Sequence, residues 1–163
     1  MKVISLNNSG IFIISVINMS YLSNKFVKSP SIIIENQPTI EENLQKIWYE
    51  IRNSVNGIKA IGLVSRIGFP ISTSFTSHEM DDDKCAAMVA SVISVADRLG
   101  LEFDSLGAFK QSIFTNSSGF LLFYDLGIDS ILFCILKTES TKLGLINYII
   151  QQKIPIIKSF LDS

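Results

Sequence analysis

The stretch Ile58–Gly100 decides the fold of this chain. It reads IKAIGLVSR (58–66), then the turn IGFP (67–70), then ISTSFT (71–76), and it ends in DDDKCAAMVASVISVADRLG (81–100). The first segment is apolar without alternation, which is typical of a central strand covered on both faces. The second segment alternates, so the two predict a hairpin. The last segment predicts a long helix over about Asp81–Leu99, with Gly100 as the residue that ends it.

Further helices and strands are predicted on both sides of this stretch. Before it, Thr39 and Glu42 have the spacing of a helix capping box, and an apolar stripe follows at helical spacing. After it, the pattern predicts three strands and then a helix, over Phe109–Thr115, Phe120–Asp125, Ser130–Lys137 and Leu143–Leu161. We expect Pro155 to kink or break the last helix, because proline removes a backbone hydrogen bond.

The predicted fold class is an α/β (α+β) sandwich with the order α-β-β-α-β-β-β-α. Several strands are apolar on both sides, so helices must cover both faces of one antiparallel five-stranded sheet. We expect residues 39–163 to form this domain and residues 1–38 to be an N-terminal extension. In the extension, Val3–Leu6 and Ile11–Ile17 flank the turn formers NNSG and could form a β-hairpin. The extension could also pack elsewhere or be partly disordered, and the sequence leaves these alternatives open.

Composition favours a protein partner over nucleic acid or membrane. The 163 residues include 14 basic and 15 acidic ones, for a formal net charge of −1. This balance gives no electrostatic reason to expect nucleic acid or an anionic membrane as a partner. Only 18% of residues are charged, below the usual quarter, which makes a buried protein–protein interface plausible. The apolar run Ile11–Ile17 is too short to span a bilayer, so we expect no membrane insertion.

The chain has no recognisable arrangement of catalytic or metal-binding residues. Cys85 and Cys134 have no CxxC or Cys/His neighbours, so we interpret both as buried thiols in a reducing, cytoplasmic compartment. His78 cannot form a metal site alone, and the run Asp81–Asp83 is better explained by helix capping than by a cation site. Gly-rich phosphate motifs are absent. We therefore expect no enzyme activity, no cofactor and no metal.

The long helix has an unusual outer face. At 100° per residue, its sheet-facing side is predicted to hold Cys85, Met88, Val89, Val92, Ile93, Val95, Ala96 and Leu99. The opposite side would hold Ala86, Ala87, Ala90, Ser91 and Ser94, without charge. Such a face could be a weakly polar, solvated surface. We favour close contact with the same helix of a second copy, so glutamate at Ala87 or Ala90 should weaken a homodimer while the fold survives.

The predicted strand Phe109–Thr115 fits the same interpretation. It places Phe109, Gln111 and Ile113 on one face, and it is a candidate edge strand. An exposed edge needs protection or a partner, and Lys110 is the only obvious protecting residue. We therefore predict a dimer interface composed of Ala86, Ala87, Ala90, Ser91, Ser94, Phe109, Gln111 and Ile113, in which the sheet continues into the symmetry mate.

Five short motifs in order resemble the roadblock/LC7 family, which includes MglB-like, Ragulator-type and dynein light chain roadblock subunits. They are GLVS (62–65), GFPI (68–71), AAMVA (86–90), GFLL (119–122) and LGL (143–145). The resemblance covers about Thr39–Leu161. Many members carry aspartate at the first turn, where this chain has Ile67. The resemblance implies the same fold order and dimerisation through the long helix and the third strand.

The resemblance also implies a function. Members of the family bind small Ras-like GTPases, act as scaffolds beside them, or serve as dynein light chains. We therefore expect a non-enzymatic homodimeric interaction module that regulates or scaffolds a small GTPase, pairing with itself or with a roadblock paralogue. A dynein light chain-type adaptor and a small-molecule sensor domain remain the alternatives.

Overall fold

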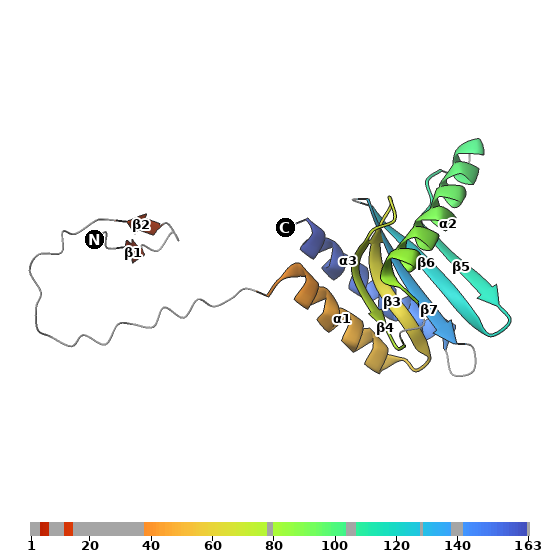
Figure 1. The fold of residues 1–163 in the computed structure, drawn as a ribbon, viewed down its shortest axis with the longest axis horizontal. Helices are drawn as coiled ribbons and strands as arrows, with labels where there is room; N and C mark the ends of the chain where they lie inside the picture. Colours follow the sequence, from red (N-terminus) through yellow and green to blue (C-terminus); the bar gives the residue numbers. More distant parts are fainter. Residues whose placement is uncertain are drawn as a thin grey trace, which may run out of the picture. The chain divides into compact units, whose positions relative to one another are not determined.

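The structure is a computed structural model that describes residues 4–6, 12–14, 38–77, 80–103, 107–127, 129–137 and 142–162. The chain divides into two compact units, Met1–Asn36 and Gln37–Ser163. In the first unit, β1 (Ile4–Leu6) pairs with β2 (Phe12–Ile14) in an antiparallel ladder. The second unit contains all the remaining helices and strands described below (Figure 1).

The second unit has the predicted order of elements. They are α1 (Ile40–Ser54), β3 (Ile58–Ser65), β4 (Pro70–Phe75), α2 (Asp82–Glu102), β5 (Gln111–Asn116), β6 (Gly119–Gly127), β7 (Ser130–Lys137) and α3 (Leu143–Leu161). The five strands form one sheet in the order β4-β3-β7-β6-β5, and every neighbouring pair is antiparallel. The predicted fold class is therefore confirmed, and β4 and β5 are the two edges of the sheet.

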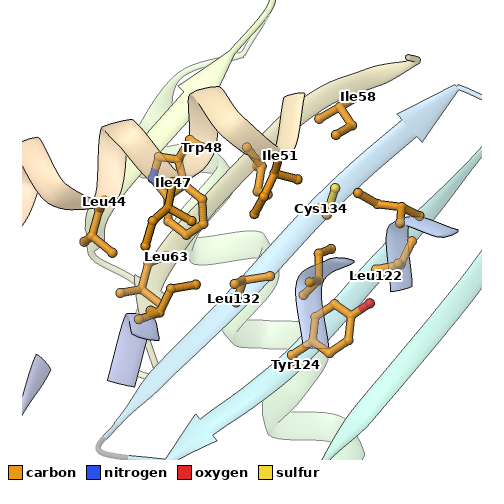
Figure 2. Packing of buried hydrophobic residues seen from close by; sticks show 14 of the residues in the cluster. Leu44, Ile47, Trp48, Ile51, Ile58, Leu63, Leu122, Tyr124, Leu132 and Cys134 are labelled. Carbon is orange, nitrogen blue, oxygen red and sulfur yellow. The ribbon is translucent and has the colours of Figure 1, made fainter. Parts of the chain in front are cut away.

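Helices cover both faces of the sheet, with α1 and α3 on one side and α2 on the other (Figure 1). The central strand β3 shows why its sequence lacks alternation. Ile61 and Leu63 point into the cluster under α1 and α3, while Ala60 and Val64 point into the cluster under α2. The first cluster is the larger one, and Figure 2 shows its side chains converging from α1, β3, β6 and β7. We call these two groups the first and second cores.

Local sequence signals fix the helix starts. Thr39 and Glu42 form the expected capping box, with backbone-to-side-chain distances of 3.1 and 2.8 Å. Asp81 caps α2, since its Oδ1 accepts a hydrogen bond from the backbone N–H of Asp83 at 2.8 Å. The capping interpretation of this acidic run is confirmed for Asp81.

Two expected helix breaks do not occur. α2 continues past Gly100 to Glu102. Gly100 has a packing role instead, since a Cβ there would lie 2.6 Å from the carbonyl oxygen of Gly107. α3 is continuous across Pro155. Both Pro155 and Gln151, whose carbonyl the proline leaves without its helical donor, are exposed, so water can solvate that carbonyl.

A hydrogen bond of the buried Trp48 indole helps to fix α1 to the sheet. Its Nε1–H donates to Oγ of buried Ser72 on β4 at 2.9 Å. We expect Ser72→Ala to lower the free energy of unfolding by about 1–3 kcal/mol, because the indole N–H loses its partner inside the protein. Urea unfolding measures the change. Ser159→Ala, at an exposed position of α3, is the control and should be near neutral; equal effects of both substitutions would contradict a stabilising role of the bond.

Candidate interaction surface

The predicted outer face of α2 is correct for some of its small residues and wrong for others. Ala86 and Ala90 are buried, together with Cys85, Val89 and Ile93, so the prediction that they face outward is wrong. Ala86 packs in the second core, and Ala90 is covered by the turn between β3 and β4, which lies against this helix. A Cβ at Gly68 would stand 3.3 Å from the Cα of Ala87 and 3.7 Å from the Cβ of Ala90. Small side chains here make room for the chain's own turn.

Large apolar side chains take the outward position instead. Met88, Val95 and Leu99 are 52%, 58% and 56% exposed, although the pattern placed them on the sheet. Val92, half-buried against the second core, completes a row at helical spacing. We call Met88, Val92, Val95 and Leu99 the apolar stripe of α2. Ala87, Ser91 and Ser94 are exposed beside it, as predicted for an outer face.

The β4 edge of the sheet is covered by side chains of α1. Gln45 Nε2 donates to the carbonyl oxygen of Thr73 at 3.0 Å, and Arg52 Nη1 donates to that of Phe75 at 3.4 Å. Arg52 also donates to the hydroxyl of Ser74 at 2.6 Å. These backbone acceptors are therefore already bonded, and α1 opposes the pairing of another strand with β4.

The β5 edge is different, because its apolar side chains remain exposed on both faces. Ile113 and Phe114 are both exposed, and the Phe114 ring meets Phe123 edge-on at 5.7 Å on the α2 side of the sheet. Within the described residues, no side chain bonds to the backbone of β5 as Gln45 and Arg52 bond to β4. This edge offers both backbone groups and apolar area to a partner.

Gln111 has a structural role that the sequence did not reveal. Its amide donates to Asn147 Oδ1 at 2.9 Å and accepts from Gln151 at 3.1 Å, while the hydroxyl of Tyr124 donates to the same Asn147 oxygen at 2.8 Å. Gln111 thereby fixes β5 to α3. Phe109 precedes the strand and packs against the second core. The prediction that Phe109 and Gln111 share one face is wrong, because they reach opposite sides of the sheet.

Arg66 connects α2 to the sheet. It follows β3 and forms ion pairs with Asp97 of α2 and with Asp125 of β6, the latter at 2.8 Å. Burial lowers the pKa of Arg66, but the hydrogen bonds and charges of Asp125 and Asp97 outweigh it and raise the pKa overall. The backbone N–H of Arg66 also donates to the carbonyl of Asp129 at 2.8 Å. Nothing in the local pattern marked this residue as the link between three elements.

Comparison with known proteins assigns the family. Residues 49–137, more than half of the chain, match the model of the Roadblock/LC7 domain. The chain belongs to the Roadblock/LC7 family. Comparison with curated proteins gives no match.

Several solved structures superpose on most of this chain. Myxococcus xanthus MglB has a TM-score of 0.65 at 21% identity and covers 75% of this chain and 100% of its own. A Roadblock/LC7 domain from Streptomyces avermitilis has a TM-score of 0.64 at 17% identity, covering 71% and 94%. The gliding protein MglB from Thermus thermophilus has 0.65 at 14%, covering 74% and 90%. At these identities the likeness establishes the fold.

The described residues of this Roadblock/LC7 domain contain neither a metal-binding cluster nor a helix suited to cross a membrane. Within the described ranges, histidine, cysteine and carboxylate side chains form no group of three or more that could hold a metal ion. No helix in the described part of the chain has the length and apolarity to cross a membrane. His78 lies outside the described residues. Cys85 and Cys134 are free, buried thiols, as expected.

The two buried thiols of the Roadblock/LC7 domain predict that its free energy of unfolding falls at alkaline pH. Burial, and secondarily Asp82, raises the pKa of Cys85 from 9.0 to about 11, and burial also raises the pKa of Cys134. An unfolded thiol ionises near its ordinary pKa while the folded one keeps its proton, so this stability is present below about pH 9 and is lost as pH rises towards 11. We expect urea unfolding at pH 8, 9.5 and 10.5 to show a falling free energy of unfolding.

The matched variant for this prediction is Cys85→Ala with Cys134→Val. Its dependence on pH between 8 and 10 should be shallower than that of the unmodified chain, because neither state then carries a thiol to ionise. Burial, and then Cys134, also raises the pKa of Tyr124. The free energy of unfolding of the variant should therefore still fall at higher pH, where the unfolded tyrosine ionises. Identical slopes for the two proteins would exclude the thiols as the source.

Proposed function

We propose that this chain is a homodimeric interaction module, or pairs with a roadblock paralogue, through α2 and β5. The observation that carries the proposal is the apolar stripe, whose Met88, Val95 and Leu99 are more than half exposed in the single chain. A row of large apolar side chains on one helix is suited to burial against a partner. Ser91 borders the stripe, while Ala86 and Ala90 no longer belong to the proposed contact.

The open β5 edge supports a two-fold arrangement. Antiparallel pairing of β5 with its symmetry mate would join two five-stranded sheets and satisfy the free backbone groups of both edges. Exposed Phe114 lies on the same face of the sheet as α2, so the partner's apolar stripe could cover it. Both contacts are self-complementary, as a two-fold interface requires.

For its role, we propose a non-enzymatic, cytoplasmic regulator or scaffold of a small Ras-like GTPase. The proposal rests on membership of the Roadblock/LC7 family and on the likeness of the fold to MglB structures. The functional module would be residues 39–163, with residues 1–38 as its extension. A small-molecule sensor would need a cavity between the sheet and α1 and α3, where the described residues instead pack as the first core.

Sedimentation equilibrium of the pure chain at micromolar concentration tests the dimer. The expected mass is twice the 18.1 kDa of one chain, and a clean monomer would refute the dimer. The GTPase step has its own test. Small Ras-like GTPases of the same organism, loaded with GDP or a non-hydrolysable GTP analogue, are titrated into the chain by calorimetry. Binding that differs between the two nucleotide states supports the role; no binding to any of them refutes it while the dimer stands.

A further inference from the structure

The turn between β3 and β4 holds two large apolar side chains in water. Ile67 and Phe69 are 82% and 65% exposed. The turn is nevertheless fixed, because Ser65 makes three hydrogen bonds to it: its N–H donates to the Phe69 carbonyl at 2.8 Å, its hydroxyl accepts from Phe69 N–H at 2.9 Å, and its carbonyl accepts from Gly68 N–H at 3.0 Å. A rigid turn presents such side chains without losing conformational entropy on binding.

A hollow of about 440 Å³ lies between this turn and α2. It is a shallow depression open to water rather than an enclosed pocket, with room for one side chain of a partner. Small residues open the space on the helix side, and two arginines border it; the lining includes Gly68, Ala87, Ser91, Ser94, Arg66 and Arg98. We call this the turn hollow.

One cation without a partner in the described part of the chain, Arg98, borders the turn hollow. Both charged side chains in its described lining are cations. Arg66 is already bonded to Asp97 and Asp125, whereas exposed Arg98 makes no hydrogen bond or ion pair with any residue that the structure describes. A guanidinium in this state is available to a carboxylate, to which it can donate two parallel hydrogen bonds.

We propose that the turn hollow docks a protein partner that presents an apolar side chain next to a carboxylate. The apolar side chain lies between Ile67 and Ala87, and the carboxylate binds Arg98. The hollow and the apolar stripe occupy neighbouring sides of α2 that meet at Val95. The proposal rests on the proposed function and deepens it, because it requires the second copy to cover the stripe and leave the side of α2 that carries Arg98 to a third protein.

The probe is a short peptide with capped ends that contains phenylalanine next to glutamate. The control peptide has glutamine in place of the glutamate. Titrated into the full, nitrogen-15-labelled chain, the glutamate peptide should shift the amide resonances of Gly68, Ser91, Ser94 and Arg98. The glutamine peptide should bind about two- to fivefold more weakly, the range of an exposed ion pair. Arg98→Gln should remove that difference between the peptides, while Lys46→Gln, an exposed cation on α1, should preserve it.

Several outcomes would overturn the proposal. Shifts scattered over the chain, or equal affinity of the two peptides for the unmodified protein, would show that the hollow does not recognise this chemistry. Peptide binding that splits the dimer in sedimentation would place the hollow inside the contact between copies. Failure of every GTPase to bind would count against the proposed function alone, because the peptide titration needs neither GTPase nor nucleotide.

Discussion

Val95→Glu is expected to yield a chain that sediments at 18.1 kDa instead of twice that mass. Val95 is exposed in the single chain, so the substitution should leave the fold of each copy intact. In the proposed dimer the glutamate would be taken out of water into an apolar contact, and this desolvation costs several kcal/mol even with Arg98 three residues further along the helix. The dissociation constant should therefore rise by at least about a hundredfold. Sedimentation equilibrium over a concentration series measures it.

Tyr148→Glu is the matched control. Tyr148 is 62% exposed on α3, close to the 58% of Val95, but it lies on the opposite side of the sheet from α2. This variant should remain a dimer. If Val95→Glu also remains a dimer, the apolar stripe is not the contact. Ala90→Glu is now expected to destabilise the single chain, because Ala90 is buried beside the β3–β4 turn.

Gly62→Val is expected to lower the free energy of unfolding by about 3 kcal/mol or more. A Cβ at Gly62 would stand 2.7 Å from the Ser72 carbonyl oxygen and 2.9 Å from the ring of Phe133. The first of these atoms is backbone of the adjacent strand, so the clash can be relieved only by moving β4 away from β3. Urea unfolding, or failure to recover folded protein from expression, records the loss.

The control for this prediction is another glycine of the same domain. Gly144 lies in α3, and a Cβ there meets nothing within 4 Å. Gly144→Ala should be neutral or stabilise the helix by up to about 1 kcal/mol, because alanine has the higher helix propensity. A Gly62→Val protein as stable as Gly144→Ala would show that β4 can shift without cost.

The sequence predicted the order and type of elements because these depend on local patterns. The unbroken apolar run of β3 indicated cover on both faces, and the structure divides its side chains between two cores. The capping residues Thr39 and Asp81 gave the starts of α1 and α2 to within a residue. These signals act through neighbours in the chain, so no knowledge of the tertiary structure was needed.

The orientation of α2 could not be predicted in the same way. The helix is apolar or uncharged around most of its circumference between Cys85 and Ser94, so two faces were both acceptable against the sheet. In the structure the β3–β4 turn lies against Ala87 and Ala90, where there is room only for small side chains, and such a contact is invisible in the helical pattern. The pairing of Arg66 with Asp97 and of Gln111 with Asn147 joins residues far apart in the chain. Such pairs carry no periodic signal.

The hydrogen bonds from Gln45 and Arg52 to the β4 carbonyls also limit polymerisation. A sheet with two free edges can add chains without end, which is the route to fibres. With one end of the sheet occupied by α1, the strand pairing proposed for β5 would consume the remaining free edge of each copy, and growth would stop at two chains. In that arrangement the two polar side chains of α1 would oppose the cross-β stacking that exposed apolar strand edges favour.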